Sequence, residues 1–460
     1  MRSFILWSRR LKLVLPLLFL SSAAEAADVQ FDGMYRARLR VFDTLSLDRD
    51  AQNSEGYSSV AKHRVWLRPS FILSDQVSAF VDLRALHNVS WGQQATETAL
   101  GSNGGAIVSD NLTPPTDGSP ETNLATWRAW AEFQTGSSQF RFGRMPVHWA
   151  SGIWWNDGTS AQQLMSDHGD VVDRVSWKYL VDNQFYVGAG VDLKSEGLSN
   201  VQDDTLGYHG TLFYRNETVN AGMVAEYRHT AAPDENERFN LFTMDLALDA
   251  ELGKLSAHLE TVGQFGGGAL PDIGDGVSLT AFGALLDVGL QAEPWTLQMA
   301  TGLATGDEDP NDLRLRTFSF DPDYSVGLFM FEQTMPVMVD AVPTEANDGR
   351  TYDEALTGGA ISNAFFVKPT VSRDLGRSWT ARGYLLAAWA AKLPSSEQIR
   401  KRYGMEAGLG INYAGIEHVE LDTQFGIFQP GTYYSESTAT STATFEDIAL
   451  GGQVVGLVRF

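Results

Sequence analysis

Three arginines near the start of the chain alternate with apolar residues. Arg36, Arg38 and Arg40 are separated by Ala37 and Leu39. Guanidinium groups stay charged at physiological pH, so this spacing suits the attraction of anions. In a β-strand the three side chains would share one face, because successive side chains point to opposite faces.

Other charged residues fall on one strand face when their apolar neighbours are turned outward. The basic set comes mainly from the first third of the chain: Arg36, Arg38, Arg40, Arg64, Arg68, Arg84, Arg128, Arg141, Arg174, Lys178, Arg228 and Arg382. The acidic set comes from later segments: Asp245, Glu260, Asp287, Glu406, Glu420 and Asp422. If these faces line a channel, a basic wall faces an acidic one, and the field between them favours polar solutes. For single residues, the alternative is mutual neutralisation of arginines and carboxylates.

The segment 144–170 contains side chains that suit carbohydrate binding. Aromatic faces stack on sugar rings, and amide and carboxylate groups bond hydroxyls. The residues concerned are Trp149, Trp154, Trp155, Asn156 and Asp157. The segment is also too long for a simple crossing between neighbouring strands, so we expect it to fold inward as a constriction. The alternatives for each tryptophan are an aromatic belt at a membrane interface or packing of the loop on a rim.

Metal sites have little support in the sequence. Asp307, Glu308, Asp309 and Asp312 offer the oxygen ligands that Ca²⁺ prefers, but their spacing matches no complete calcium loop and Pro310 stiffens the segment. The eight histidines are scattered singly, without the spacing of a zinc site. We expect no cofactor, with structural calcium at this acidic segment as the alternative.

The charged residues lie in short segments of alternating polarity, which predict β-strands. The first runs from Phe31 to Val41 and the last from Leu450 to Phe460. Others begin near Arg64, Ala79, Asn123, Gln139, Val171, Gln184, Leu206, Val219, Phe239, Lys254, Ser278, Trp295, Asn363, Trp379, Tyr403 and Glu417. The series predicts an all-β fold, a single antiparallel transmembrane β-barrel of about 18 strands, with 16 as the alternative.

Connections between these strands alternate in length. Short turns such as 135–138 and 181–184 take every second place, and long segments near 88–122, 144–170, 305–362 and 429–445 take the others. Short periplasmic turns and long extracellular loops are typical of outer-membrane barrels. Both chain ends then lie on the periplasmic side.

The first residues have the features of an export signal. Basic residues precede an apolar run from Leu13 to Leu20, and Ala24-Glu25-Ala26 forms a small-x-small cleavage site. The run is shorter than the roughly 20 residues that a spanning helix needs. We predict a signal peptide over residues 1–26 and a barrel over residues 27–460, located in the bacterial outer membrane.

Composition excludes several classes of protein. The formal net charge of −23 argues against nucleic acid as a partner, because phosphate contacts need clustered lysine and arginine. The chain has no cysteine, so disulfides and Cys-based metal sites are excluded. The expected partners are outer-membrane lipid, lipopolysaccharide and small hydrophilic solutes.

Two loop sequences resemble a known family. Phe140 to Arg144 reads Phe-Arg-Phe-Gly-Arg and precedes the Trp-rich stretch, and Gly306 to Pro310 reads Gly-Asp-Glu-Asp-Pro ahead of Thr317-Phe318 and Asp321-Pro322. This order is similar to that of the alginate-export group of outer-membrane porins. The resemblance implies a passive channel, with an arginine-rich lumen in members that pass a polyuronate.

The sequence therefore predicts a porin-like channel for hydrophilic solutes, including anionic or saccharide (polyuronate-like) ones, and no enzymatic activity. The alternative is an outer-membrane hydrolase carried on a barrel, because His168 lies between Asp167 and Asp170. No motif places a nucleophile beside this group, which weighs against the hydrolase.

Overall fold

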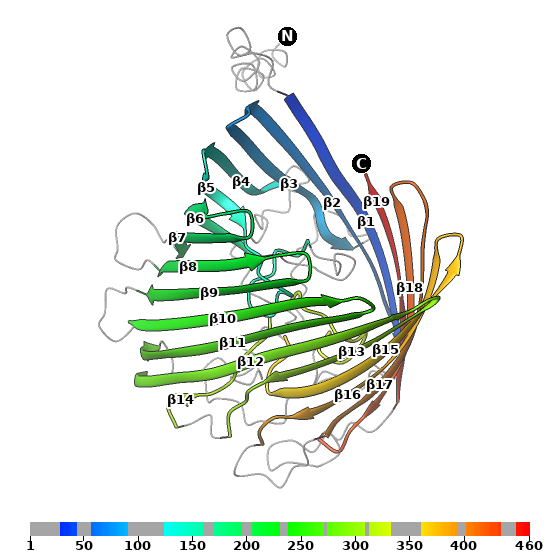
Figure 1. Ribbon diagram of the computed structural model, residues 1–460. Coiled ribbons are helices and arrows are strands. Elements are labelled where there is room, and N and C mark those ends of the chain that lie inside the picture. Colours follow the sequence, from blue (N-terminus) through cyan, green and yellow to red (C-terminus); the bar gives the residue numbers. More distant parts are fainter. Residues whose placement is uncertain are drawn as a thin grey trace, which may run out of the picture.

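The computed structural model describes residues 28–43, 57–90, 124–159, 169–195, 205–230, 238–270, 274–308, 312–332, 360–393, 402–433 and 448–460. These residues form one β-sheet that closes on itself (Figure 1). Within this part of the chain, no helix has the length and hydropathy to cross a membrane. The predicted signal peptide lies outside the described residues.

The strands follow one another around the barrel in chain order. They are β1 (Asp28–Asp43), β2 (Tyr57–Ser74), β3 (Val77–Ser90), β4 (Leu124–Thr135), β5 (Ser138–Pro146), β6 (Val171–Leu180), β7 (Phe185–Ser195), β8 (Thr205–Arg215), β9 (Val219–Thr230), β10 (Phe239–Leu252), β11 (Leu255–Leu270), β12 (Gly274–Ala292), β13 (Trp295–Ala304), β14 (Arg314–Leu315), β15 (Ala364–Gly376), β16 (Trp379–Ala390), β17 (Arg402–Ile416), β18 (Val419–Pro430) and β19 (Ala449–Arg459).

Eighteen of the nineteen described strands make the wall. Each pairs antiparallel with its neighbours, and β13 pairs directly with β15. The two-residue β14 instead pairs parallel with Ser278 and Leu279 of β12. These residues lie beyond Gly283, where the pairing of β12 with β13 ends. Strand β14 thereby covers a strand edge that would otherwise be unpaired. The predicted antiparallel barrel of about 18 strands is confirmed.

The first and last strands close the barrel. Met34 to Asp43 of β1 pair with Leu450 to Arg459 of β19, so the start of β1 and the end of β19 lie at the same end (Figure 1). The closure continues past β19, because the backbone N–H of Gly33 donates to the Phe460 carbonyl at 2.7 Å and the Phe460 N–H donates to the Gly33 carbonyl at 3.0 Å. A Cβ atom at position 33 would collide with the Phe460 ring, so the absence of a side chain at Gly33 leaves the space that the ring fills.

Side chains alternate between an exposed apolar face and a buried polar face. Phe31, Leu409 and Phe425 are 73%, 69% and 64% exposed, whereas Arg36 and Asp422 are 1% and 0% exposed. A soluble protein would place these faces the other way round, because burying charge and exposing large apolar side chains both cost free energy in water. The exposed apolar face is the outer surface of a transmembrane barrel.

Short turns join β2 to β3, β4 to β5, β6 to β7, β8 to β9, β10 to β11, β12 to β13, β15 to β16 and β17 to β18. In some of these turns a polar side chain accepts hydrogen bonds from nearby backbone N–H groups. The Asp182 carboxylate accepts hydrogen bonds from the N–H groups of Gln184 and Phe185, both at 2.8 Å. Asn216 accepts from Thr218 and Val219 in the same way at 2.8 and 2.7 Å. These Asx turns reverse the chain in very few residues, as the alternating connection lengths require.

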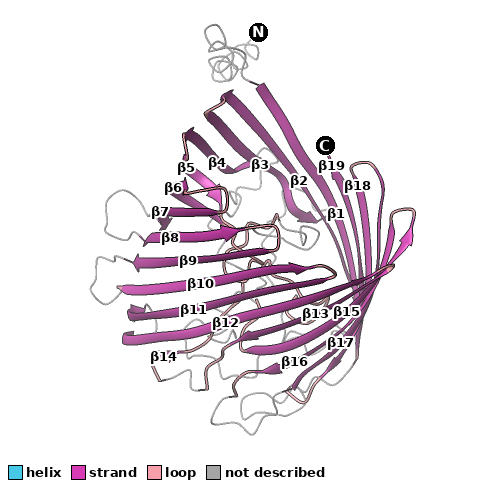
Figure 2. Ribbon diagram, viewed as in Figure 1, coloured by secondary structure: helices cyan, strands magenta, loops and turns pink. Residues whose placement is uncertain are grey.

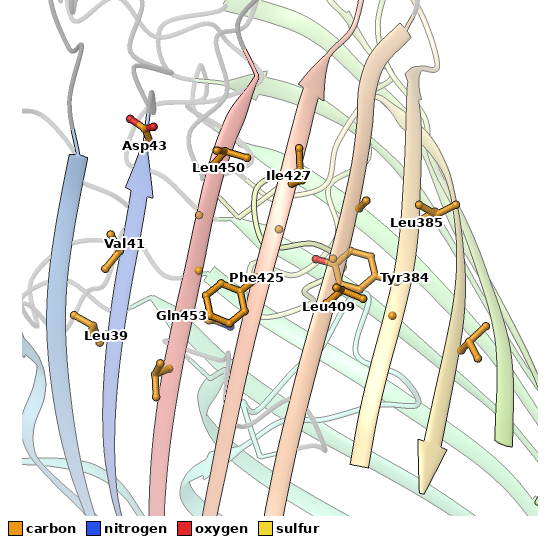
Figure 3. Close-up of a pocket in the computed structure, with 18 of the residues that line it drawn as sticks. Leu39, Val41, Asp43, Tyr384, Leu385, Leu409, Phe425, Ile427, Leu450 and Gln453 are labelled. Atoms are coloured by element: carbon orange, nitrogen blue, oxygen red, sulfur yellow. The ribbon is translucent and has the colours of Figure 1, made fainter. Parts of the chain in front are cut away.

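The outer surface is hollowed over β15 to β19 and β1. A groove of about 930 Å³ there is lined by outward apolar side chains, among them Leu39, Val41, Leu385, Phe425 and Ile427 (Figure 3). Small outward residues at Gly383, Ala407 and Gly452 also line it. Because the groove belongs to the apolar outer face, it faces the hydrocarbon of the bilayer and not the solute path.

A charge on the outer face should destabilise the barrel more than the same charge on the inner face. Leu409→Arg, midway along β17, should lower the free energy of unfolding in lipid vesicles by about 2–4 kcal/mol, as for an arginine at the bilayer midplane. The matched control is Gln424→Arg, because Gln424 points inward and pairs with Gly410, the residue next to Leu409. Equal losses of unfolding free energy for the two variants would contradict the assignment of the faces.

Candidate functional site

The inner face of β1 to β4 carries a dense group of arginines. Arg36, Arg38, Arg64, Arg84 and Arg128 are all between 0% and 2% exposed. Arg36 lies directly opposite Arg64 in the register of β1 and β2. The structure therefore brings together on one wall the basic residues that sequence reasoning assigned to separate inward positions.

Aromatic rings separate these like charges. The Trp66 ring centroid lies 5.1 Å from the guanidinium of Arg64, and 4.5 Å from those of Arg68 and Arg84. The Arg84 guanidinium also lies 3.7 Å from the centroid of Trp127. Negative ring faces attract the cations and offset part of their mutual repulsion. Neither tryptophan was singled out from sequence. Trp66 alternates with Arg64 and Arg68, whereas Trp127 lies next to Arg128 at a β-bulge, which simple alternation does not predict.

One carboxylate lies among these arginines. Asp82 of β3 is 2% exposed, and its Oδ2 lies 3.5 Å from Arg68 Nε and 3.7 Å from Arg128 Nη1. Asp82 thus lies between Arg68 and Arg128. Among the described residues, arginines outnumber carboxylates on the inner face of β2 to β4.

Arg40, at the edge of this group, reaches two other elements. Its Nε donates to Gln453 of β19 at 3.4 Å, and its Nη2 lies 3.8 Å from Glu332 Oε2. Glu332 belongs to the connection between β13 and β15. The basic wall therefore contacts the connection between β13 and β15.

The remaining predicted basic residues are mostly paired with carboxylates across the strands. The shortest distances are 2.8 Å for Arg141–Glu132, 2.6 Å for Arg174–Asp192, 3.1 Å for Arg228–Glu226 and 2.8 Å for Arg382–Asp422. For these residues mutual neutralisation holds. Sequence reasoning missed Glu132, Asp192 and Glu226, although each occupies an inward position of its strand. Lys178 is exposed and lies 3.8 Å from the Tyr186 ring centroid.

Two of the predicted acidic residues bind the loop that follows β5. The Trp149 indole N–H donates to Asp245 Oδ1 at 3.1 Å, and the Ser151 N–H donates to Glu260 Oε2 at 2.8 Å. The Ser151 hydroxyl also bonds Glu260. Asp245 and Glu260 are both 0% exposed. The loop covers this part of the acidic wall, so these carboxylates do not line an open channel as predicted.

Glu406 of β17 holds a second loop. Its carboxylate accepts hydrogen bonds from the N–H groups of Leu328, Phe329 and Met330 at 2.6, 3.1 and 2.9 Å, and from the Tyr384 hydroxyl at 2.6 Å. Three successive N–H groups around one carboxylate form an anion-binding nest. Glu406 is therefore an anchor for residues 312–332 and not a free charge.

The last predicted acidic residues differ in position. Asp422 pairs with Arg382, as above. Glu420 lies near a short turn, where its carboxylate pairs with Arg459 at 3.1 Å and accepts a hydrogen bond from Asn412 at 2.9 Å. Asp287 is half-buried on the inner face of β12. The predicted acidic wall is thus divided between loop anchors and local pairs.

Several loops, drawn pink in Figure 2, run behind the strands of the barrel. The bonds of Trp149 and Ser151 to the inward residues Asp245 and Glu260 place the loop 147–159 inside, and its tryptophans are largely occupied. Trp149 and Trp155 are 9% and 6% exposed. Trp154 and Trp155 stack on one another with centroids 4.3 Å apart. Trp155 also lies 4.9 Å from Arg174 and 5.2 Å from Lys194. For Trp149 and Trp155 the structure thus shows the alternative of loop packing, and stacking of a sugar on the rings of this loop stays a prediction.

The polar residues of this loop are also engaged. Asn156 Oδ1 accepts a hydrogen bond from the Gly158 N–H at 3.0 Å. Asp157 Oδ1 accepts from the N–H and hydroxyl of Thr159 at 3.0 and 2.6 Å. Both side chains therefore shape the loop, and the prediction that they bond solute hydroxyls finds no support in their geometry.

Residues 312–332 cross the interior from β12 to β1. Phe318 packs where Gly283 has no side chain, and Phe329 packs in the same way against Gly426 and Gly451. Phe329 also meets Phe42 of β1 edge to face, with centroids 5.4 Å apart. Glycines on the inner wall thus leave the recesses that the loop aromatics fill.

The two infolded loops meet at three carboxyl groups. Asp170 belongs to the first loop, and Asp321 and Asp323 belong to the second. Asp170 Oδ2 accepts from the Asn156 N–H at 3.1 Å, and Asp323 accepts from the N–H of Gly169. The Asp321 side chain hydrogen-bonds Asp170, which requires a proton between the two carboxyl groups.

Burial explains how this junction keeps its proton. Loss of solvation raises the pKa of Asp170 to about 6, although the Asn156 N–H opposes the shift. Burial, with the nearby charges of Asp170 and Asp323, raises the pKa of Asp321 well above its ordinary value. Both shifts favour a proton that the two carboxyl groups share, so one carboxyl group donates a hydrogen bond to the other.

The acidic segment considered for calcium is held by cations. Arg316 pairs with Asp307 at 2.9 Å and with Asp312 at 3.0 Å, and Lys392 pairs with Glu308 at 2.9 Å. These pairs lower the pKa values of Asp312 and Glu308. Asp309 lies outside the described residues. In the described ranges, no group of three or more His, Asp or Glu side chains is arranged to hold a metal ion.

Comparison with known proteins identifies the architecture. No protein-family model and no curated protein sequence matches the chain. Similar solved structures include OccAB1 of Acinetobacter baumannii (TM-score 0.54, 8% identity, covering 96% of this chain and 98% of that one). Another is OpdL of Pseudomonas aeruginosa (TM-score 0.53, 9% identity, 94% and 99% covered). The fold is that of outer-membrane porins. At such low identity the likeness concerns the fold alone.

Removal of the Glu406 charge should release the second loop. Glu406→Gln loses charged acceptors for three N–H groups, and we expect the docked loop to lose about 3 kcal/mol. Because the chain has no cysteine, Met330→Cys provides a buried reporter. Its labelling by a thiol reagent should accelerate about a hundredfold in the Glu406→Gln background. Glu420→Gln is the control, and equal labelling in all three proteins would contradict the anchor.

The carboxyl junction should make the loop contact pH-dependent. Its raised pKa values mean that the joined loops bind protons which separated loops release, so the contact is strongest below the ordinary pKa of 3.8 and weakens as the pH rises through about 6. Fluctuation of single-channel current should therefore increase from pH 5 to pH 8. Asp321→Asn should flatten this dependence, whereas Asp312→Asn on the same loop should preserve it. Greater fluctuation toward acid pH would refute the assignment.

Proposed function

We propose that this chain is a passive channel of the bacterial outer membrane for hydrophilic solutes, with a preference for anionic ones. The observation that supports this proposal is that the infolded loops cover one side of the inner wall and leave the other side to arginines. Carboxylates of β10, β11 and β17 bind the infolded loops, whereas arginines cluster on β1 to β4. Fixed positive charge in a low-dielectric channel raises the local concentration of anions.

The two infolded loops supply the proposed constriction. They fill the interior between β5 and β1 through contacts of Trp149, Glu406 and Phe329, so a solute has to pass beside them. A wall that repels cations acts most strongly where the path is narrow, because water screens charges less there. Selectivity for anions over cations would then arise because the arginines lie beside the narrow path that the loops leave open.

The solute class has support from two directions. One similar structure is that of OpdK of Pseudomonas aeruginosa with vanillate, at 8% identity and a TM-score of 0.52. Vanillate is a carboxylate, as the proposed preference requires. The resemblance of residues 140–144 and 306–322 to the alginate-export group stays a prediction, and it extends the proposal to saccharide acids such as polyuronates. Conduction along a gradient needs no cofactor.

The proposal places the apolar outer face in contact with outer-membrane lipid and lipopolysaccharide. No observation favours the alternative hydrolase. His168 and Asp167 lie outside the described residues, and Asp170 is bonded to Asp321 in the loop junction.

Neutralising the first arginines should weaken anion preference. The combined variant Arg36→Gln, Arg38→Gln and Arg40→Gln should lower the chloride-to-potassium permeability ratio by roughly twofold or more, because three fixed charges are removed from the wall. Reversal potentials under a salt gradient in planar bilayers measure this ratio. The control is Arg373→Gln, because Arg373 stacks on Trp295 at an exposed position. Unchanged reversal potentials in the triple variant would refute the proposed selectivity, and a silent membrane with ester turnover would favour the hydrolase.

A further inference from the structure

A row of aromatic side chains lies on the inner face of β3, β4, β7 and β8, apart from the arginine cluster. We name Phe80, Trp130, Tyr186 and Phe213 the aromatic track. Phe80 is opposite Trp130 in the register, and their rings stack with centroids 4.9 Å apart and planes 14° apart. Tyr186 is opposite Phe213, and these rings stack at 5.0 Å and 29°.

These rings belong to the interior and remain partly accessible. All four are of intermediate exposure. Their strands carry separate aromatic side chains on the outer face, such as Phe133 and Tyr214, which are 39% and 37% exposed. The aromatic belts of a barrel face lipid at its two interfaces, so an interior row has no role in holding the protein in the membrane.

Two cations lie between the two halves of the track. Arg141 of β5 lies 5.9 Å from the Trp130 centroid and pairs with Glu132 at 2.8 Å. The Lys178 ammonium lies 3.8 Å from the Tyr186 centroid, and among the described residues no carboxylate pairs with it. An exposed inner-face ammonium group without an acidic partner is available to a carboxylate of a solute.

The strands leave room beside this ammonium group. Gly188 of β7 lies directly opposite Lys178 and adds no side chain to the inner face. Beyond it, Phe213 meets the edge of Trp149, whose centroid is 6.2 Å away. Trp149 belongs to the first infolded loop, so the track runs along the wall from β3 to the contact between Phe213 and that loop.

We propose that the aromatic track is a binding site for solutes that carry a flat ring face next to a carboxylate. This inference rests on the proposed channel function and adds the chemistry of its solute. The ring of the solute stacks on Trp130 or on the Tyr186–Phe213 pair, as apolar C–H and π faces do. Its carboxylate pairs with Lys178 and Arg141. Sugar acids and aromatic acids share this chemistry.

The test is block of single-channel current by added solutes. An oligoglucuronate and 4-hydroxybenzoate are the two ring carboxylates, succinate is the carboxylate without a ring, and maltotriose is the ring without a charge. Trp130→Leu and Tyr186→Leu should each weaken block by at least one ring carboxylate about fivefold, with succinate unchanged. Lys178→Gln should weaken block by the ring carboxylates and leave maltotriose unchanged. The ring carboxylate that responds identifies the source of the solute.

The control is Phe142→Leu, which removes an aromatic ring from the outer face of β5 next to Arg141 and should change no block. Open-channel conductance in salt alone reports both folding and the proposed channel function. If no variant or native protein conducts, the channel function fails. If all conduct but Trp130→Leu, Tyr186→Leu and Lys178→Gln are blocked like the native protein, or the two ring variants lose succinate block equally, the aromatic track is refuted while the channel stands.

Discussion

Every backbone N–H and C=O group in the hydrocarbon layer has to be paired within the protein, and the rest of the structure depends on this constraint. It requires the pairing of β1 with β19 and the extra bonds between Gly33 and Phe460. Closure then divides every strand into a lipid face and an inner face. Because Phe31 and Leu409 face lipid, the residues next to them in each strand point inward. This alternation concentrates charge in a confined interior.

Concentrated charge has to be compensated, and the two sides of the barrel do this differently. On β1 to β4, indole rings such as Trp66 lie among the guanidinium groups and leave their positive charge in place. On β10, β11 and β17, the carboxylates accept hydrogen bonds from loop N–H groups, as Glu406 does. Hydrogen bonds to backbone satisfy a buried carboxylate without bringing in a positive side chain. The same inward alternation thus yields a positive wall and a wall covered by loops.

The strands were predictable because period two and turn residues are local signals. The alternation of Phe31 to Val41 with arginines already determined which face each residue takes, and the predicted count of about 18 strands is confirmed. Loop docking was not predictable, because its partners are distant in sequence. Glu406 binds residues about eighty positions earlier through backbone groups, which carry no sequence signature. Trp149 and Trp155 looked free for the same reason, since their partners Asp245 and Lys194 lie on other strands.

The position of the loops also explains which parts of the interior stay accessible. Anchors at Asp245, Glu260 and Glu406 draw both loops toward the acidic side, and the Asp170–Asp321 contact ties them to one another. Glycine recesses at Gly426 and Gly451 let the second loop lie flat against the wall. The first loop also contacts Arg128 of β4 and packs beside Trp130, whereas Lys178 stays exposed. The placement of inward carboxylates therefore decides where the loops dock, and by exclusion it decides which wall a solute can touch.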